Sequence, residues 1–395
     1  MRIALDARTV YSAQRRGTGK NLLDLYDHVA RLRPRWRIIA YHRTPDPLPA
    51  QMAGQQTQPR FIEMIGDRLD AWGRWRLPLA AWRDGADVMH CPANNCPSWM
   101  TVPAVVTIHD LIPLDLAAAR DPMLARRFEQ SVTCACAKAA QIVCPSFYTA
   151  ARLTRQFGAD PQRITVIPWA PDSSMRAVEP EAWPAVMARY GVSRPFVLHL
   201  GAAAPRKNTR RVLQVWSEVE PSIRKRHHLL VVGLDPSFGN RMRQWAHQLE
   251  IEDSVTLCGF APPEDLPTLM SAADVLAYPS LSEGFALPLL DAWVAGTAVL
   301  CADATSLPEV AEDAAFLVDP ADTDAIARSL EYLLSSPQVR ADLIQRGRRR
   351  VRNFSWQKTA ELFVDVIEQA ASQTADGALR ERMEMPCGLQ NRISM

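Results

Sequence analysis

The sequence predicts an α/β protein with two parallel sheets. Short apolar runs of buried-strand length alternate with helical patterns along most of the 395 residues. This alternation is typical of parallel strands flanked by helices. The chain is longer than one hydrophobic core usually organises, and its 48% of hydrophobic residues can fill two cores. We therefore expect two Rossmann-like halves, with ligands beyond the carboxyl ends of the strands.

The expected strands form two sets along the chain. The first set is residues 3–5, 37–41, 87–90, 104–108, 141–144 and 165–167. The second set is residues 196–200, 228–232, 254–258, 274–277, 298–301 and 315–318. Proline, serine and charged residues break the strand signal between 171 and 195, so we place the domains at 1–175 and 176–355. A further helix is expected at 356–372, and residues 373–395 have no sustained apolar period and are expected to form a flexible tail.

The segment Ser282–Trp293, SEGFALPLLDAW, follows the strand expected at 274–277 and enters a helix. Backbone N–H groups at such a helix start carry partial positive charge and suit a diphosphate. Glu283 and Asp291 cannot bind that anion, but carboxylates do accept hydrogen bonds from the vicinal hydroxyls of a ribose or a sugar. The chemistry predicts a nucleotide diphospho-sugar. The donor-binding residues expected in this segment are Gly284, Phe285, Ala286, Leu287 and Asp291.

A basic pair follows the first strand of the second half. The segment GAAAPRKN runs from Gly201 to Asn208, and Arg206 and Lys207 stand immediately before the next helix. A guanidinium and an ammonium at this position would stabilise the charge that grows on a departing diphosphate. The alternative interpretation is an exposed basic pair on a surface loop.

Several of these motifs occur together in one known family. The segment 282–293 resembles the Glu-x7-Glu signature, EGFGLPxLEAxxxG, of the retaining glycosyltransferases of family 4, which have the GT-B fold. The likeness extends from Met1 to about Ser372, through LDARTV, VTIHDL, IVCPSF, VIPWAPD, LGAAAPRKN, LCGFAPPEDLPTLMSAADV and SLPEVAEDAAFLVDP. It implies two Rossmann-like domains facing each other across a cleft, with the nucleotide-sugar donor on the second and the acceptor on the side of the first. It also implies that the helix at 356–372 crosses back to the first domain.

The resemblance assigns roles to further residues. A histidine matching His109 lies close to the donor sugar in the family, and a loop matching the one around Phe260 borders the nucleobase. The glycine loop after the first strand contributes to the donor phosphate, which implies roles for Gly17, Thr18 and Gly19. The catalytic residues implied are His109, Arg206, Lys207 and Glu283, and Gly201 joins the donor-binding set.

Departures from the family pattern include Asp291, Ala204 and Lys20. Asp291 replaces the usual glutamate and is one methylene shorter. A small shift of the helix would compensate for the lost reach; alternatively, the shorter side chain would change the nucleotide preference, or it marks a degenerate enzyme. Ala204 stands where acidic residues are common. Lys20 replaces an arginine-like residue, and we place it on the acceptor side. A triphosphatase P-loop is excluded here, because it requires a glycine at Gln14 and Ser or Thr at Asn21.

The segment Arg68–Arg83, RLDAWGRWRLPLAAWR, has two interpretations. Trp72, Trp75, Leu79 and Trp82 repeat at helical spacing among arginines. A basic aromatic face of this kind would contact anionic lipid or a lipid-linked acceptor, which makes Trp72 and Trp75 acceptor-side or membrane-side candidates. The interpretation that we favour is an amphipathic helix packed on the sheet, with its arginines in water.

Composition excludes several other classes. A net charge of +2 without a long basic run gives no case for nucleic acid. No spacing of His, Cys, Asp or Glu is typical of a metal site, so we expect neither a metal nor a cofactor, and we interpret the eight cysteines as packing residues. The start MRIALDAR lacks the regions of a signal peptide, and no apolar stretch is long enough to span a membrane. We expect a cytoplasmic location, with peripheral contact at the inner face of the membrane as an option.

The predicted function is a retaining glycosyltransferase. It would move a hexose of mannose or glucose type from a nucleotide diphospho-sugar to a hydroxyl of a polysaccharide or lipid-linked acceptor, in envelope or exopolysaccharide synthesis. One alternative is a catalytically inactive nucleotide-sugar-binding relative. Another is a sugar-nucleotide epimerase of the same architecture. A Rossmann dehydrogenase is disfavoured, because no G-x-G-x-x-G follows the first strand.

Overall fold

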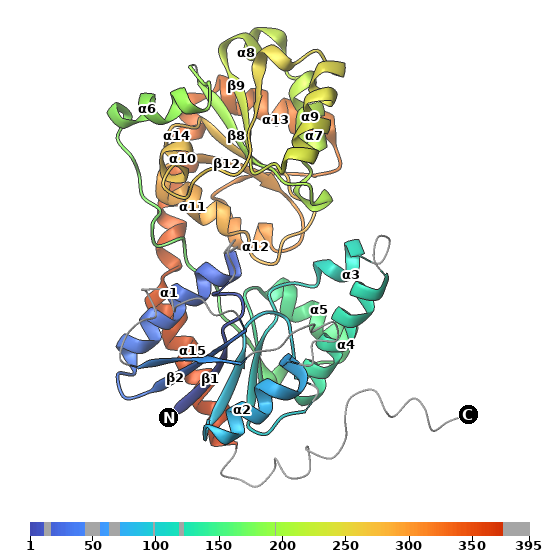
Figure 1. The fold of residues 1–395 in the computed structure, drawn as a ribbon. Helices are drawn as coiled ribbons and strands as arrows, with labels where there is room; N and C mark the ends of the chain where they lie inside the picture. The colour runs from blue at the N-terminus through green and yellow to red at the C-terminus, as the bar shows by residue number, and fades with distance from the viewer. Residues whose placement is uncertain are drawn as a thin grey trace, which may run out of the picture. The chain divides into compact units, whose positions relative to one another are not determined.

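The computed structural model describes residues 1–11, 17–43, 56–62, 72–97, 99–117, 122–193 and 195–373. Within these residues the chain forms two compact α/β units (Figure 1). The first unit comprises Met1–Trp169 and the segment that begins at Ser355, and the second comprises Ala170–Phe354. The second unit therefore begins slightly before the boundary predicted from sequence at 175. The predicted tail, from 374 onward, lies outside the described residues.

The first unit contains a seven-stranded parallel sheet in the order β3-β2-β1-β4-β5-β6-β7. Its central strand β1 pairs on both sides, so that Ile3 is in register with Ile38 on β2 and with Val88 on β4. The strands are β1 (Arg2–Asp6), β2 (Arg37–His42), β3 (Thr57–Phe61), β4 (Val88–Cys91), β5 (Ala104–Thr107), β6 (Gln141–Cys144) and β7 (Ile164–Val166).

Strand β3 is the one strand of this sheet that the sequence analysis missed. Its sequence is TQPRF, and four of its five residues are exposed, so it has neither an apolar run nor an alternating pattern. It pairs only with β2 and forms the edge of the sheet. An edge strand tolerates Pro59 because one side of its backbone needs no hydrogen-bonding partner in the sheet.

Helices cover both faces of the first sheet. Ala4, Met89 and Val106 point into one core with α2 and α4, whereas His90 on the opposite face contacts α1 and α15. The helices are α1 (Gly17–Leu32), the π-helical turn η2 (Trp72–Arg76), α2 (Leu77–Arg83), α3 (Ile112–Ala117), α4 (Pro122–Lys138), α5 (Phe147–Phe157) and α15 (Trp356–Ser372).

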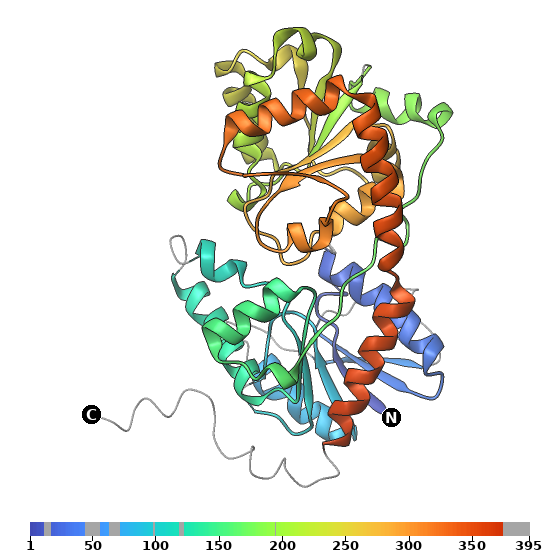
Figure 2. The same ribbon diagram turned by 180° about the vertical axis from the view of Figure 1, so that it is seen from behind.

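The last helix, α15, packs beside the first helix of the chain, as both views show (Figures 1 and 2). Phe363 contacts the rings of Tyr26 on α1 and His90 on β4. Arg33 pairs with Glu368 at 2.8 Å. The carboxyl-terminal helix is thus part of the first unit.

The second unit contains a six-stranded parallel sheet in the order β10-β9-β8-β11-β12-β13. Each of its strands lies within about a residue of a predicted range, so the prediction of two parallel Rossmann-like sheets is confirmed. The strands are β8 (Phe196–Leu200), β9 (His228–Val232), β10 (Val255–Leu257), β11 (Val275–Tyr278), β12 (Ala298–Ala302) and β13 (Phe316–Val318).

Short connections place a helix after almost every strand of the second sheet. The α-helices of the second unit are α6 (Trp183–Arg189), which precedes β8, and α7 (Thr209–Glu218), α8 (Pro221–Arg226), α9 (Pro236–Gln248), α10 (Leu266–Ser271), α11 (Leu287–Ala295), α12 (Leu307–Ala311), α13 (Thr323–Ser335) and α14 (Pro337–Arg350). Pro288 stands in the first turn of α11, as its missing N–H predicts. Among the helices of the described ranges, none combines the length and the apolarity needed to span a bilayer.

Candidate active site

Two loops at the carboxyl edge of the second sheet bring the predicted charges together. One loop follows β8 and carries Arg206 and Lys207 in a short 3-10 turn, Pro205–Lys207. The other follows β11 and carries Glu283 before α11. Because β8 and β11 are parallel neighbours, their following loops emerge side by side at the same edge.

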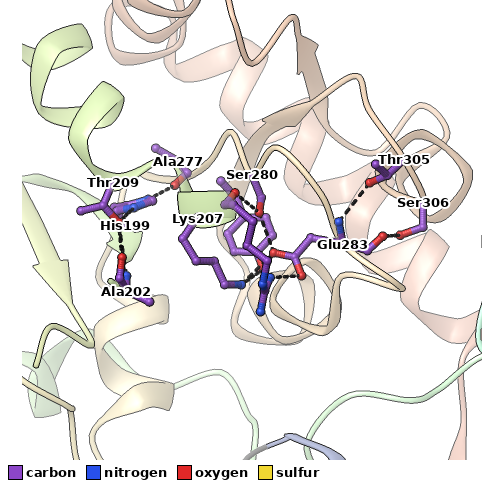
Figure 3. Close-up of polar contacts among 11 residues, drawn as sticks. His199, Ala202, Lys207, Thr209, Ala277, Ser280, Glu283, Thr305 and Ser306 are labelled. Atoms are coloured by element: carbon purple, nitrogen blue, oxygen red, sulfur yellow. Dashed lines mark hydrogen bonds and ion pairs between the residues drawn. The ribbon is translucent and has the colours of Figure 1, made fainter. Parts of the chain in front are cut away.

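The carboxylate of Glu283 is the centre of a closed polar cluster (Figure 3). Arg206 Nη1 donates to its Oε2 at 2.6 Å, and Lys207 Nζ donates to its Oε1 at 2.8 Å. The same Oε1 accepts from Tyr278 OH at 2.7 Å and from Ser280 Oγ at 2.6 Å. Lys207 Nζ also donates to Tyr278 OH and lies 4.6 Å from the centre of that ring. One acid and two cations thus share a single site.

The electrostatics of this cluster follow from burial and from the two cations. Burial alone would raise the pKa of Glu283, but Lys207 and Arg206 outweigh it and hold that pKa below its ordinary value. Burial lowers the pKa of Lys207, and Glu283 opposes that shift. Burial raises the pKa of Tyr278 well above its usual range, so the phenol is neutral. With the carboxylate and both cations ionised, the cluster has a formal charge of +1, which suits an anionic ligand.

Backbone contacts hold the two loops against each other. Leu281 N donates to Arg206 O at 2.7 Å, and Ser280 Oγ, which donates its proton to Glu283, lies 2.8 Å from the same oxygen. Asn208 Nδ2 donates to Pro279 O at 3.0 Å. Asn208 itself has a φ of 58°, in the left-handed region that asparagine tolerates better than most residues. The position of Arg206 therefore depends on the loop after β11.

A buried histidine links the first loop to the sheet (Figure 3). His199 on β8 has Nδ1 at 2.8 Å from Ala277 O and Nε2 at 3.1 Å from Thr209 Oγ1. A carbonyl only accepts, so Nδ1 carries the proton and Nε2 accepts from Thr209. Thr209 Oγ1 in turn accepts from Ala202 N at 3.2 Å. Burial lowers the pKa of His199 to about 4, which keeps this ring neutral.

Gly201, predicted to bind the donor, has a packing role in this loop. A Cβ at this position would lie 2.8 Å from Val231 Cγ1 and 2.9 Å from Leu234 Cδ2. The absence of a side chain thus lets the loop pass close to β9 and the residues after it. Any contact of Gly201 with a donor would be made by its backbone.

A third loop, after β12, fixes the backbone of Glu283 (Figure 3). Thr305 Oγ1 accepts from Glu283 N at 3.1 Å, and Ser306 Oγ donates to Glu283 O at 2.9 Å. Ser306 is fully buried. The main chain of Glu283 is thus hydrogen-bonded on both sides, which limits the freedom of its carboxylate.

The start of α11 has an unusual backbone. Ala286 has a φ of 81°, in the left-handed region that favours glycine, and the family signature has glycine at this position. The side chains of Phe285 and Ala286 are buried, and Phe285 packs edge-on against Phe354. Contacts of this pair with a donor would therefore come from backbone N–H groups, as the sequence analysis predicts.

Asp291, on α11, has a partner that the sequence analysis did not anticipate. Its Oδ1 accepts from Asp172 N at 2.9 Å. Asp172 ends the motif VIPWAPD, and its own carboxylate accepts from Ser174 N and Oγ. The short acid of α11 thus connects this helix to Asp172, near the start of the second unit. A role for Asp291 in ribose binding stays a prediction.

In the first unit His109 follows β5 and is held on several sides. Its Nε2 donates to Pro92 O at 2.6 Å, and its backbone N donates to Asn94 Oδ1 at 2.6 Å. The ring stacks on Trp169, with 5.6 Å between centroids. Burial lowers the pKa of His109, so the imidazole is neutral with Nδ1 as its acceptor. A neutral, oriented ring suits hydrogen bonding to a sugar hydroxyl.

Other predicted residues lie at three places in the fold: the start of α1, the loop after β10 and the turn η2. Gly17, Thr18, Gly19 and Lys20 form the first turn of α1, so the expected glycine loop is a helix start. Phe260 lies in the loop after β10 and is 73% exposed. Trp75 is exposed on η2, whereas Trp72 is fully buried and donates Nε1 to Ile62 O at 3.0 Å. The prediction that Trp72 faces an acceptor or a membrane is corrected, because its ring is in the core.

Sequence reasoning missed the uncharged partners of the cluster. Tyr278 is the last residue of β11 and Ser280 follows it, neither carries a motif of its own, and Thr305 and Ser306 come from a different loop. The one sequence signal for an uncharged residue that supports the cluster was Asn208, the final residue of the motif RKN, which bonds to the loop after β11. Across the described ranges, no group of three or more His, Cys, Asp or Glu side chains is arranged to hold a metal ion.

Comparison with known proteins agrees with this geometry. Residues 190–350 match the family model of Glycosyl transferases group 1, and residues 15–174 match that of Glycosyltransferase Family 4. The chain is 29% identical over 310 residues to O-antigen chain mannosyltransferase B of Escherichia coli, covering 78% of this chain and 79% of that protein. It is 30% identical over 318 residues to MMP alpha-(1->4)-mannosyltransferase of Mycolicibacterium hassiacum, covering 75% and 74%.

Solved structures show the same fold. WaaG, a glycosyltransferase involved in lipopolysaccharide biosynthesis, superposes with a TM-score of 0.71 at 16% identity and covers 93% of this chain and 99% of that chain. Anabaena Alr3699/HepE, solved in complex with UDP and glucose, gives a TM-score of 0.71 at 17% identity and covers 95% and 100%. The two Rossmann-like units therefore form a GT-B fold. The chain belongs to the glycosyltransferases of family 4, the group 1 glycosyl transferases.

Proposed function

We propose that this glycosyltransferase is a retaining hexosyltransferase that uses a nucleotide diphospho-sugar and acts on a hydroxyl of a polysaccharide or lipid-linked saccharide. The observation that carries the proposal is the buried cluster of Glu283 with Arg206 and Lys207 at the carboxyl edge of the second sheet. The relatives named as mannosyltransferases favour mannose as the sugar. The HepE structure with UDP-glucose supports a nucleotide-sugar donor.

The two cations would stabilise the leaving group. As the bond between the anomeric carbon and the phosphate oxygen breaks, negative charge grows on the diphosphate. Arg206 and Lys207 are already oriented by Glu283, and a diphosphate beside them would gain charge-assisted hydrogen bonds without the reorganisation of mobile side chains. Because the protein itself supplies two positive charges, we propose that transfer requires no metal ion.

The proton released by the acceptor hydroxyl is taken up by the donor's own phosphate, so the reaction needs no protein base. In a front-face route the acceptor hydroxyl attacks the side of the anomeric carbon that the diphosphate leaves. The departing phosphate oxygen takes the hydroxyl proton, so no protein nucleophile is needed and the configuration is retained. We assign Glu283 to the positive charge at the anomeric carbon, Asp291 to the ribose hydroxyls and neutral His109 to a hydroxyl of the donor sugar.

The test is a panel of nucleotide sugars with GDP, UDP and ADP carriers, with and without saccharide acceptors. Acceptor-dependent nucleotide release is expected, with GDP-mannose as the best donor, and NMR of the product should show the anomeric configuration of the donor. Lys207→Ala and Glu283→Ala should each reduce turnover at least a hundredfold. Treatment with EDTA should leave the wild-type rate unchanged.

Other outcomes would decide against the proposal. Nucleotide-sugar binding without turnover would identify an inactive binding relative, which the short Asp291 motivates. Interconversion of sugar nucleotides without transfer would identify an epimerase. An inverted product would refute the retaining route, and loss of activity in EDTA that is restored by Mg²⁺ would refute the metal-independent one.

A further inference from the structure

The loop that follows β4 holds His109 at two points. We call residues 92–96 the 92–96 loop. Pro92 O accepts a hydrogen bond from ring Nε2 of His109 at 2.6 Å, and Asn94 Oδ1 accepts from the backbone N of His109 at 2.6 Å. Strands β4 and β5 are parallel neighbours, so this loop and His109 emerge at the same edge of the first sheet. One loop therefore fixes both the main chain and the ring of His109.

Asn94 is anchored to two neighbouring elements, β5 and α4. Its backbone N donates to Thr107 O at 3.0 Å, and its backbone O accepts from Ser131 Oγ on α4 at 3.1 Å. Ser131 Oγ in turn accepts from Cys96 N at 3.0 Å. With the side-chain bond to His109, the backbone N–H, the backbone carbonyl and the amide oxygen of Asn94 are all hydrogen-bonded.

The backbone of Asn94 restricts which side chains suit this position. Its φ is 57°, in the left-handed region that glycine, asparagine and aspartate adopt more readily than other residues. A backbone N–H only donates, so the oxygen of the amide, and not its nitrogen, must face His109. Glycine would permit the conformation but would offer no acceptor. Asparagine therefore meets two requirements here, the conformation and the hydrogen bond.

The bond to Pro92 selects the tautomer of His109. A carbonyl oxygen only accepts, so Nε2 carries the proton and the neutral ring has Nδ1 as an acceptor. Among the residues that the structure describes, none donates to Nδ1, and His109 is half-buried. A ligand that meets this ring therefore finds an acceptor, which suits a hydroxyl group.

We propose that Asn94 is a positioning residue that fixes His109 with Nδ1 presented to a hydroxyl of the donor sugar. The inference rests on the proposed function, because it takes His109 to contact the donor. Asn94 acts through His109 and needs no contact with the sugar. Without its amide oxygen the backbone N of His109 loses its acceptor, and the ring can leave Pro92 and populate both tautomers.

The first measurement needs no turnover. Nitrogen-15 NMR of the full-length chain reads the protonation of each ring nitrogen, and comparison with His109→Ala assigns the signals of His109. The wild type should show Nε2 protonated and Nδ1 unprotonated at neutral pH. Asn94→Gly, which tolerates the φ of 57°, should show both tautomers, whereas Asn94→Asp keeps an acceptor oxygen and should keep the wild-type tautomer.

Asn95→Gly is the matched control for these variants. It deletes the same amide one residue further along the 92–96 loop, where the side chain donates to Asp6 Oδ2 at 3.0 Å and does not contact His109. The tautomer of His109 should therefore stay as in the wild type. A cooperative thermal transition in each variant shows that the chain is folded.

The second measurement uses the hydroxyls of the donor. Mono-deoxy analogues of the nucleotide sugar that the donor panel selects each lack one hydroxyl, and with the wild type one analogue should lose about tenfold in kcat/KM. His109→Ala and Asn94→Gly should lose about as much with the complete donor, and should no longer distinguish it from that analogue. Asn94→Asp and Asn95→Gly should distinguish the two as the wild type does.

Four results would overturn the inference. They are a wild-type His109 protonated on Nδ1, an unchanged tautomer in Asn94→Gly, an unchanged preference for the complete donor in Asn94→Gly, and an equal loss in Asn95→Gly, which would assign the effect to flexibility of the 92–96 loop. Turnover with an unchanged preference in Asn94→Gly refutes this inference and leaves the proposed function standing. The expected change of tautomer without turnover of any nucleotide sugar refutes the proposed function and leaves the positioning of His109 by Asn94 established.

Discussion

The ion pair between Glu283 and Lys207 gives a quantitative test of the cluster. Both side chains are largely buried, with exposed fractions of 10% and 16%. Glu283→Gln keeps the shape of the side chain but leaves two cations without their counter-charge, and removal of one partner of a buried pair costs about 3–5 kcal/mol. Lys207→Met leaves Glu283 paired with Arg206, so a smaller loss of about 1–3 kcal/mol in the free energy of unfolding is expected.

The double variant separates the pair from its surroundings. If the two charges interact directly, Glu283→Gln/Lys207→Met should be more stable than the sum of the single losses by about 1–3 kcal/mol. The assay is urea unfolding followed by circular dichroism, with denaturant slopes compared across the cycle. The pair of Arg350 and Glu312, 2.9 Å apart but with Glu312 60% exposed, is the control and should show a coupling below about 1 kcal/mol.

The pH dependence of this coupling also has a defined sign. The folded-state pKa of Glu283 lies below its ordinary value of 4.5, so the carboxylate stabilises the fold at any pH above that value. The contribution falls as the pH falls from 4.5 through the folded-state pKa. If the loss in unfolding free energy of the double variant at neutral pH equals the sum of the two single losses within about 0.5 kcal/mol, the reasoning is refuted, because the two charges would then not interact.

Three further predictions concern residues around the cluster. Burial lowers the pKa of His199 to about 4, so between about pH 6.5 and pH 4 the unfolded chain binds a proton at this residue and the folded chain does not, which destabilises the fold as the pH falls. His199→Gln should remove up to about 3 kcal/mol of this acid destabilisation, measured by unfolding titrations across that pH range. Ala286→Gly should raise stability by about 1 kcal/mol, seen as a higher Tm, since the φ of 81° disfavours a side chain. Asp291→Glu restores the family residue but alters the bond to Asp172, so donor KM should change more than kcat in steady-state kinetics.

The elements predicted from sequence were those with strong local signals. The strands other than β3 are apolar runs bounded by turn residues, and the loop bearing Arg206 has a specific motif between a strand and a helix. Strand β3 was missed because an edge strand needs no apolar run. The placement of Trp72 on one face with Trp75 and Trp82 was wrong, because periodicity assumes a regular helix and a π turn breaks that assumption.

The partners within the candidate site had no local signal. Tyr278 and Ser280 bond to Glu283 across a short loop, and Thr305 reaches its backbone from beyond the next strand. Such contacts depend on the order of strands in the sheet, which places β11 and β12 side by side. Hydroxyl-bearing residues of this type are too common in loops for their presence to predict a role. Only their assembled positions distinguish them.

The arrangement of the cluster changes the interpretation of its charges. The sequence suggested a division in which the cations meet the diphosphate and the acids meet hydroxyls, yet Glu283 directly holds both cations. An acid that orients two cations reduces their net charge but fixes their direction, and fixed direction is what stabilises a developing charge in a transition state. Under the proposed function, donor binding would exchange hydrogen bonds within the cluster rather than create them all anew, so part of the binding energy would be offset in the ground state. The same exchange would become more favourable as charge grows on the leaving oxygen, so Glu283 would favour the transition state over the bound donor.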